Sequence, residues 1–487
     1  MPGLTERVRD VCARAVAALD GDAELVAEAE AIARRLDEPL RLAIAGRAKA
    51  GKSTLLNALV GELLAATDAA ECTRVVTWYR EGIVYGAEVV LDDGSKRPVM
   101  LRRDEVGRVS IDLGGVAAGD AARIDISWPS SQLRTVTLID TPGLESVHDE
   151  VSARTRDFLA PDDGSADADA VVYLMRHLHE RDAEFLESFA DRSLAIASPA
   201  NAVAVLSRAD EIGACRPDAL VSARRIADRY EADPQVGALV GAVVPVAGLL
   251  AETAATLAEH EAGWLRQLAA LDAPQVEALL ESVQRFVGIE DCPLAPEVRS
   301  DLLDRFGLFG IRFCVAALRD GTCATASDLE RAMLEVSGLP ALRRLVQDRF
   351  VRQAAGLKAR SVLASLRALA RRAGHRGAAL EALVEEAEAS SPELLELRVL
   401  TLVLAGATRL DAAEGQEAVR ALTATTDAGR VGAGEHDEPS VLATAALAGA
   451  ERWRTLGADP VHDPLTVEVC DIVARVHERI YLGAVQG

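Results

Sequence analysis

The chain has 487 residues, more than one ordinary domain needs, so we expect two or three domains. Apolar residues make up 49% of the sequence and exclude a mainly disordered chain, and only 3% of the residues are aromatic, which argues against a protein that stacks single-stranded nucleic acid. The net charge of −23 argues against a general DNA or RNA coat, and we expect no nucleic-acid partner.

Cysteine usage and hydropathy indicate a cytoplasmic protein. The seven cysteines are scattered and form no C-x-x-C pair, so they read as reduced thiols rather than a disulfide framework or a zinc ribbon. The first 18 residues are charged and contain no continuous apolar segment of a secretory signal. No run reaches about 18 uninterrupted apolar residues, so we expect no membrane span.

The N-terminal region (residues 1–38) is predicted to be helical. Val8, Val11, Cys12, Ala15 and Leu19 recur at helical spacing, which predicts one amphipathic helix over residues 4–36 that ends before Pro39.

The next region (residues 39–250) has the pattern of an α/β domain. Short apolar runs alternate with helical stretches, as in a mostly parallel sheet with helices on both faces. The cluster at residues 92–95 predicts a hairpin turn. The predicted strands are residues 41–45, 74–80, 83–91, 123–128, 135–139, 170–175, 202–206 and 242–244.

The last region (residues 251–487) is predicted to be all-helical. Ala, Leu, Glu and Arg dominate it, and proline and glycine breaks separate long amphipathic stretches. Two segments stand out. Residues 341–376 carry nine arginines and one lysine against one acid, and residues 399–405 are apolar apart from Thr401. Each is a membrane-contacting candidate, but the first could instead pair with the acidic residues 381–396 and the second could be bundle core.

A phosphate-binding loop follows the first predicted strand. Residues 46–53 fit G-x-x-x-x-G-K-[ST], with an apolar strand before them and a helix after them. Glycines let backbone N–H groups converge on phosphate oxygens, and the helix N-terminus adds partial positive charge. The lysine reaches the β- and γ-phosphates and the serine hydroxyl binds Mg²⁺. The predicted nucleotide-binding residues here are Gly46, Lys49, Ala50, Gly51, Lys52, Ser53 and Thr54.

Two further segments fit the γ-phosphate and the metal. Asp140 and Gly143 form D-x-x-G directly after a predicted strand, where the carboxylate can hold Mg²⁺ through water and the glycine N–H can sense the γ-phosphate. Thr73 is the candidate switch residue that closes on Mg²⁺, with Thr67 and Thr77 as competing choices. The predicted metal set is therefore Ser53, Thr73 and Asp140.

The base is predicted to be guanine. Ser207, Arg208 and Asp210 follow a predicted strand in a pattern close to the [NT]-K-x-D motif of GTPases. The Asp210 carboxylate can accept hydrogen bonds from guanine N1–H and the 2-amino group, whereas adenine offers no such pair. Arg208 can stack along the base. Residues 245–247 resemble the weak fifth guanine motif. An ATPase would share only the phosphate-binding loop and would leave Asp210 unexplained.

In these motifs, and in residues 48–55, 73–78, 207–214 and 305–312, the sequence resembles the dynamin superfamily of large GTPases. It looks most like bacterial dynamin-like proteins, in particular the actinobacterial isoniazid-inducible C type. The resemblance covers nearly the whole chain. It implies a GTPase domain over residues 39–250 and a stalk of antiparallel helices over residues 251–487 that includes the N-terminal helix.

The resemblance also implies how hydrolysis is organised. Leu144 stands where small GTPases carry a water-positioning glutamine, and an apolar side chain cannot orient water. Dynamin-like proteins dimerise across their nucleotide faces instead, and a polar loop residue and a monovalent cation offset charge between the β- and γ-phosphates. Lys49 matches that polar position, so we hypothesise that its ammonium replaces the cation. The expected catalytic residues are Lys49, Lys52, Ser53 and Thr73.

Taken together, these residues predict a cytoplasmic GTPase that uses Mg²⁺. The resemblance implies self-assembly, a possible heterotypic dynamin-like partner, and membrane remodelling or maintenance on the anionic inner face of the plasma membrane. The alternative is a soluble regulatory or assembly GTPase whose helical half docks a protein or ribonucleoprotein partner without touching lipid.

Overall fold

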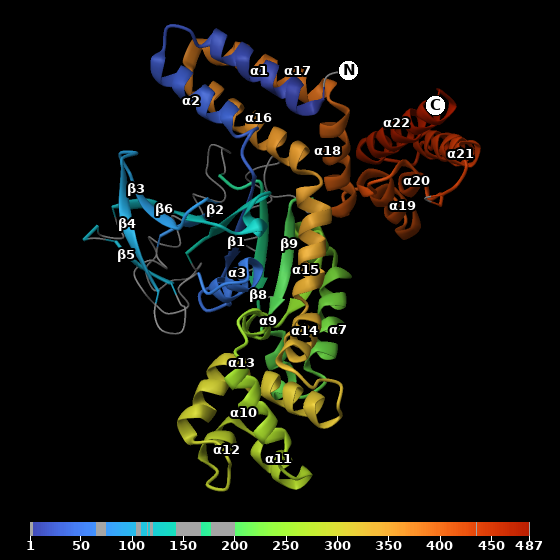
Figure 1. Ribbon diagram of the computed structural model, residues 1–487. Helices are drawn as coiled ribbons and strands as arrows, with labels where there is room; N and C mark the ends of the chain where they lie inside the picture. Colours follow the sequence, from blue (N-terminus) through green and yellow to red (C-terminus); the bar gives the residue numbers. More distant parts are fainter. Residues whose placement is uncertain are drawn as a thin grey trace.

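The computed structural model describes residues 3–64, 75–103, 109–113, 115–116, 120–142, 167–176, 200–434 and 436–486. A twisted sheet occupies the middle of the molecule, and helical groups lie at its two ends and to one side (Figure 1). An α/β domain joined to a helical half confirms the predicted fold class.

Within the described residues the sheet has ten strands in the order β10-β9-β8-β1-β7-β2-β6-β3-β4-β5. The five strands from β10 to β7 are parallel, β2 runs antiparallel to β7, and β3, β4 and β5 extend the sheet as antiparallel neighbours. The strands are β1 (Leu40–Gly46), β2 (Thr77–Glu81), β3 (Gly86–Leu91), β4 (Lys96–Arg103), β5 (Val109–Asp112), β6 (Ala121–Trp128), β7 (Val136–Asp140), β8 (Ala170–Met175), β9 (Ala202–Ser207) and β10 (Val243–Val246).

Both faces of the parallel part are covered by helices. Leu42 and Ile44 of β1 belong to the apolar cluster that includes α3 (Lys52–Val60), whereas Ala43 and Ala45 belong to the cluster that includes α7 (Ala219–Glu231). This alternation explains why β1 reads as a continuous apolar run, since each face of a doubly covered strand must be apolar. The carboxyl ends of β1, β7 and β9 therefore meet at one edge.

The predicted hairpin is present, but the strands after it were missed. Gly94 has φ +78 between β3 and β4, and the Gly94 N–H donates to the Leu91 carbonyl (2.9 Å). The β4 strand was not predicted because Lys96, Arg97 and Pro98 are untypical of a strand interior; near the sheet edge, charges and proline are tolerated. The start of the predicted strand 74–80 lies partly outside the described residues.

The prediction of one N-terminal helix was wrong. Two helices are present, α1 (Leu4–Ala18) and α2 (Ala23–Arg34), and the chain reverses between them. Gly21 adopts φ +92, and the Asp22 carboxylate caps α2 by accepting from the Leu25 N–H (3.3 Å). The Asp-Gly-Asp sequence at residues 20–22 is a strong turn and cap signal that outweighs the continuing apolar spacing.

The remaining helices form three groups. The first begins below the sheet edge at which the carboxyl ends of β1, β7 and β9 meet, and it consists of α9 (Gly248–Ala255), α10 (Glu259–Ala269), α11 (Ala273–Leu279), α12 (Val283–Gly288), α13 (Pro296–Arg319) and α14 (Ala326–Val336). We call it the base-side lobe. The second joins α1 and α2 to α16 (Ala354–Arg372) and α17 (Gly377–Ser390) around one apolar cluster. The third contains α18 (Pro392–Leu404), α19 (Ala412–Thr423), α20 (Asp427–Val431), α21 (Pro439–Gly457) and α22 (Pro464–Gln486).

A helical connection joins the sheet to the second group. The segment α15 (Leu339–Val346), the π-helical turn Gln347–Val351 and α16 follow one another (Figure 1). Short α6 (Ile212–Cys215) and α8 (Pro234–Leu239), and the 3₁₀ turns Ser131–Leu133, Ala209–Glu211 and Gly374–Arg376, complete the described elements.

Both membrane candidates lie largely inside the helical packing. Val399 and Leu400 are buried in the core that α18 shares with α19 and α22. Three of the nine arginines in the basic segment pair with acids of other elements: Arg367 with Glu388 of α17, Arg372 with Glu28 of α2, and Arg376 with Asp22, which caps α2. In the described part of the chain, no helix is both long enough and apolar enough to cross a bilayer.

Candidate nucleotide site

The phosphate-binding loop is formed by a sharp turn between β1 and α3. Gly46 has φ +147, and a Cβ there would lie 2.4 Å from the Leu174 carbonyl oxygen of β8, so glycine is required. Gly51 has φ +96 just before Lys52 begins α3. Lys49 also has a left-handed backbone (φ +60) and an exposed side chain. Residues 46–54 thus have the loop-to-helix geometry that the motif predicts.

Lys52 is held over this loop. Its Nζ donates to the carbonyl oxygens of Gly46 and Arg47, at 3.2 Å each. Burial lowers the pKa of Lys52, and the nearby charge of Asp140 partly offsets that effect. The ammonium therefore lies where phosphate oxygens could replace backbone carbonyls as acceptors.

Ser53 and Asp140 meet at the end of β7. The Ser53 hydroxyl donates to one Asp140 oxygen, Oδ2 (3.3 Å), while the other oxygen, Oδ1, is buried and has no hydrogen-bond partner among the described residues. Burial raises the pKa of Asp140 to about 6, although Lys52 and Ser53 oppose the rise. A hydroxyl beside a carboxylate with an unsatisfied oxygen is the donor set that Mg²⁺ prefers, so these residues fit the metal.

Not every predicted γ-phosphate residue can be placed. Thr73, Thr67 and Gly143 lie outside the described residues. Thr77 is described: it is buried in β2, and its hydroxyl donates to the Val75 carbonyl (3.2 Å). A buried hydroxyl that is already hydrogen-bonded inside the sheet is a poor candidate for the switch residue.

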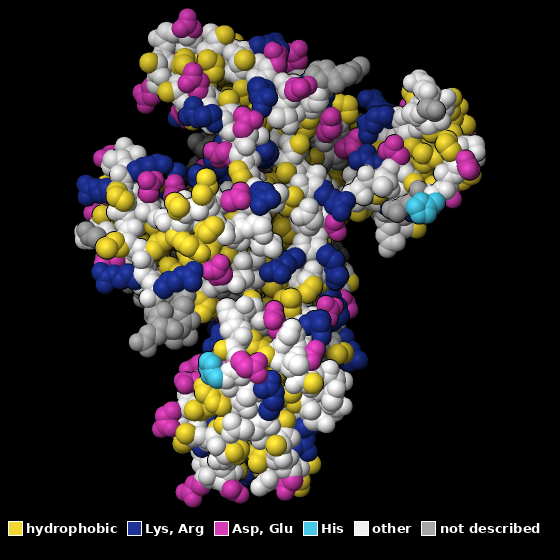
Figure 2. All heavy atoms as spheres, in the orientation of Figure 1, with side chains coloured by type: hydrophobic (Ala, Val, Ile, Leu, Met, Phe, Trp, Pro, Cys, Tyr) yellow, Lys and Arg dark blue, Asp and Glu magenta, His cyan; other side chains and the backbone are white. Residues whose placement is uncertain are grey.

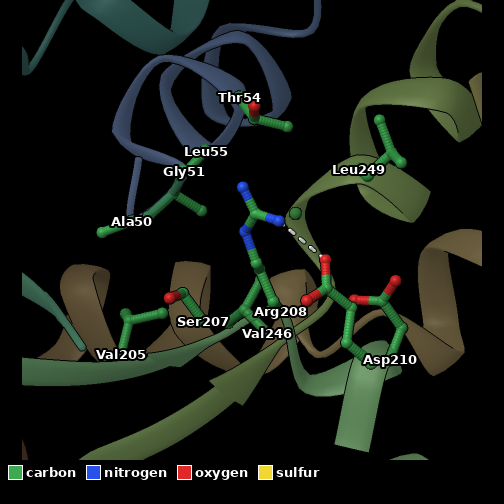
Figure 3. A pocket seen from close by; sticks show the side chains of 12 residues that line it. Ala50, Gly51, Thr54, Leu55, Val205, Ser207, Arg208, Asp210, Val246 and Leu249 are labelled. Carbon is green, nitrogen blue, oxygen red and sulfur yellow. Dashed lines mark hydrogen bonds and ion pairs between the residues drawn. The ribbon is translucent and has the colours of Figure 1, made fainter. Parts of the chain in front are cut away.

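A pocket of about 150 Å³ lies beside the loop and contains the predicted base-reading residues (Figure 3). Asp210 is 6% exposed, and burial raises its pKa to about 6. Gly248 and Leu249, at the start of α9, also line the pocket and were not predicted. The lining consists of Ala50, Gly51, Thr54, Leu55, Val205, Ser207, Arg208, Asp210, Glu211, Val246, Gly248 and Leu249.

Arg208 crosses this pocket. Its backbone is left-handed (φ +52), and its guanidinium pairs with Glu211 (2.8 Å) and donates to the Lys49 carbonyl (3.2 Å). It thereby joins the base side to the phosphate side. Ser207 has another role, since its hydroxyl donates to the Met175 carbonyl (3.1 Å) and fixes β9 against β8.

The buried carboxylate of Asp140 yields a stability prediction. Its folded-state pKa of about 6 exceeds the ordinary 3.8, so the folded chain retains this proton to higher pH, and the contribution of this group to stability falls as pH rises from about 4 to 6. At pH 7 the Asp140→Asn variant should therefore be more stable than the parent by roughly 1–3 kcal/mol in the absence of nucleotide and metal.

Denaturant unfolding with and without GDP and Mg²⁺ tests this effect. We expect the variant to gain stability without ligand and to lose most of the stabilisation that GDP and Mg²⁺ give the parent. A variant less stable than the parent at pH 7 and equally stabilised by the ligands would contradict it.

Comparisons with known proteins agree with this geometry. A sequence family described as "50S ribosome-binding GTPase" matches residues 41–202. The isoniazid-induced protein IniC of Mycobacterium tuberculosis is 36% identical over 465 residues, and the alignment covers 93% of this chain and 92% of IniC. The chain belongs to the family of the isoniazid-induced protein IniC. It is a GTPase, as predicted from the sequence.

Two further similarities are weaker. An uncharacterised protein of Caldicellulosiruptor sp. is 28% identical over 136 residues, which cover 28% of this IniC-family chain and 32% of that protein. A solved structure described as an oligomerised bacterial dynamin pair aligns over 99% of this chain and 90% of its own, with 12% identity and a TM-score of 0.34.

Proposed function

We propose that this IniC-family GTPase binds GTP with Mg²⁺ at the described edge of the sheet and couples nucleotide-dependent self-assembly to membrane remodelling or maintenance at the inner face of the plasma membrane. The observation that carries the nucleotide part is the Asp140 carboxylate, whose Oδ1 is unsatisfied beside Ser53 and Lys52. The membrane part rests on the resemblance of the sequence motifs to dynamin-like proteins.

We assign the following roles to the residues at this edge. Backbone N–H groups of residues 46–54 and the N-terminus of α3 hold the phosphates. Lys52 neutralises the β- and γ-phosphates, Ser53 and Asp140 hold Mg²⁺, and Asp210 accepts from guanine. Arg208 lies along the base. Thr73 and Gly143 are proposed to close on the γ-phosphate, as inferred from the sequence.

We also propose that Lys49 acts in hydrolysis. Its side chain is exposed at the rim of the loop, and its carbonyl accepts from Arg208. A homodimer formed across the nucleotide faces would bury this ammonium near the bond between the β- and γ-phosphates, where positive charge stabilises the transition state. A monovalent cation would then be dispensable. Higher assemblies and a heterotypic dynamin-like partner remain part of the proposal through family membership.

The proposed division of the chain is an N-terminal part (residues 1–38), a GTPase domain (39–250) and a helical part (251–487). In support, α1 and α2 share an apolar cluster with α16 and α17. The base-side lobe also contacts the GTPase domain: the buried Asn57 of α3 donates to Glu252 of α9 (2.7 Å).

A different segment now offers the best lipid contact. Ile83, Val84 and Tyr85 are 98%, 70% and 58% exposed in the β2–β3 loop, between Gly82 and Gly86. Elsewhere in the described part of the chain, large exposed apolar side chains do not occur at consecutive positions. Arg103 lies over the Tyr85 ring (5.6 Å to the centroid), which places a cation beside the apolar tip. Three such side chains and an adjacent cation suit the boundary between headgroups and acyl chains.

Liposome pelleting tests the membrane proposal. We expect the chain to pellet with anionic liposomes in the presence of a non-hydrolysable GTP analogue, and Ile83→Asp to lower the bound fraction severalfold without changing GDP affinity, because it puts a charge at the apolar tip. Val461→Asp, at a side chain that is 69% exposed elsewhere, is the matched control and should bind like the parent.

The alternative is a GTPase that docks a protein partner without touching lipid. It is favoured by two observations. Arg367 and Arg372 of the basic segment pair with acids of α17 and α2, and the apolar run of α18 packs against the core. Failure of the parent chain to pellet, with and without the analogue, would contradict the membrane proposal and support this alternative.

A further inference from the structure

The short segment after Asp210, labelled α6 (Ile212–Cys215), is a turn with an unusual backbone rather than a regular helix. Gly213, Ala214 and Cys215 follow one another with φ of +64°, +62° and +59°. Only glycine adopts this conformation at low cost, and two of the three residues carry a side chain. Such a run persists where the surrounding structure holds it in place.

Arg312 of α13 provides that hold. Its Nη1 donates to the carbonyl oxygens of Ala214 (3.2 Å) and Cys215 (2.6 Å), its Nε donates to that of Leu280 (2.9 Å), and its Nη2 donates to that of Glu281 (3.0 Å). One planar guanidinium thus ties the left-handed turn to the α11–α12 connection of the base-side lobe. The fork geometry of arginine suits several fixed acceptors, which a lysine cannot match.

The same helix also approaches the base-reading carboxylate. Gly307 interrupts α13 with φ +62° and ψ +170°, and a Cβ there would lie 3.8 Å from Asp210 Oδ2. Asp210 is only four residues before Ala214. The position of α13 therefore affects Asp210 from two sides, through contact at Gly307 and through the turn held by Arg312.

We propose that Arg312 is a positioning residue for guanine recognition, which holds the turn at residues 213–215 and thereby directs the Asp210 carboxylate into the purine pocket. Arg312 does not line that pocket. The inference rests on the proposed role of Asp210. Selectivity for guanine then depends on the base-side lobe as well as on the motif at residues 207–210, because Arg312 comes from the lobe and not from the GTPase domain.

Calorimetric affinities for GDP and IDP (inosine diphosphate) measure this role. Hypoxanthine keeps N1–H but lacks the 2-amino group, so the GDP/IDP affinity ratio reports how well the carboxylate meets both donors. The parent should prefer GDP by about tenfold, the value of one hydrogen bond near 1.4 kcal/mol. In Arg312→Ala and Arg312→Lys the ratio should fall to about twofold or less, because the carboxylate is no longer held in register.

Arg319 offers a matched control on the same helix. Its Nη1 donates to the Ala269 carbonyl (3.0 Å). This bond joins α13 to the end of α10 within the lobe and does not involve the turn at residues 213–215. Arg319→Ala should therefore loosen the lobe while the GDP/IDP ratio stays at the parental value. Gly307→Ala supplies a second test that keeps Arg312: alanine cannot readily adopt this backbone, so α13 must shift beside Asp210 and the ratio should fall.

The outcomes separate the two proposals. If Asp210→Asn leaves the GDP/IDP ratio unchanged, the proposed role of Asp210 fails. If Asp210→Asn changes the ratio but a folded Arg312→Ala does not, the role of Arg312 is overturned. Should Arg312→Ala fail to fold, Gly307→Ala decides, and an unchanged ratio in that variant overturns the inference. An Arg319→Ala variant that loses selectivity equally would also overturn it, because general loosening would then suffice.

Discussion

Replacing Lys52 by alanine should lower kcat/KM for GTP by on the order of 10²–10³-fold, the cost of removing one preorganised group that stabilises charge in the transition state. The Lys52 ammonium lies over the carbonyls of Gly46 and Arg47, at the mouth of the loop. Arg208 also donates to a carbonyl of this loop, that of Lys49, but it does so from the base side. The loss should include nucleotide binding, because the β-phosphate contact exists in the ground state as well.

Steady-state phosphate release and GDP calorimetry measure the two effects, and Lys49→Ala provides the contrast. Lys49 is exposed at the rim, so its loss should leave GDP affinity within about twofold while turnover falls about tenfold and becomes dependent on potassium. Full turnover in a folded Lys52→Ala variant would contradict the assignment of the loop. Unchanged, potassium-independent turnover in Lys49→Ala would contradict only the role of Lys49.

Changing Asp210 to asparagine should weaken GDP binding by roughly 100-fold and improve binding of xanthosine diphosphate. An ionised carboxylate accepts from both guanine N1–H and the 2-amino group, whereas an amide faces the 2-amino group with a donor. Xanthine carries a carbonyl at position 2, which that donor can satisfy. The near-complete burial of Asp210 makes any mismatch costly, because the unpaired group cannot turn to water.

The same carboxylate predicts a pH dependence. Its pKa is raised to about 6 by burial, and guanine binding requires the ionised form. GDP affinity measured without Mg²⁺, so that Asp140 does not contribute through the metal, should be constant from pH 7 to 8 and fall as pH drops below about 6. In Asp210→Asn the part of this dependence that comes from Asp210 should disappear, so the fall below pH 6 should become shallower. Equal GDP affinity in the variant, or an unchanged pH profile, would contradict the proposed base reader.

The parts of the candidate site that form short contiguous motifs could be predicted from the sequence. The strand and helix flanking residues 46–53 could be predicted because β1 is covered on both faces and so reads as one apolar run. Asp140 and Asp210 could be placed because each follows such a strand, and carboxyl ends of parallel strands meet at one edge. The Asp-Gly-Asp turn that divides α1 from α2 is visible in the sequence as a turn and N-cap signal, although the apolar spacing continues across it.

The rest depends on tertiary contacts that no local pattern contains. Arg312 lies 102 positions after Asp210, on a helix with ordinary amphipathic spacing. It reaches the turn at residues 213–215 only because α13 packs against that turn in the folded chain. The ion pairs of the basic segment depend similarly on folding, since Arg372 meets Glu28 across most of the chain. The local charge excess left two readings open, a lipid surface and pairing with the acidic residues 381–396, and the pair Arg367–Glu388 supports the second.

The most direct test of the central claim is calorimetric titration of the purified full chain with GDP and with ADP in the presence of Mg²⁺. We predict one GDP bound per chain and an affinity for ADP weaker by at least about 100-fold, because adenine offers the Asp210 carboxylate no pair of donors. Equal affinities for the two nucleotides, or no binding of GDP, would contradict the assignment of this edge of the sheet as a guanine-nucleotide site.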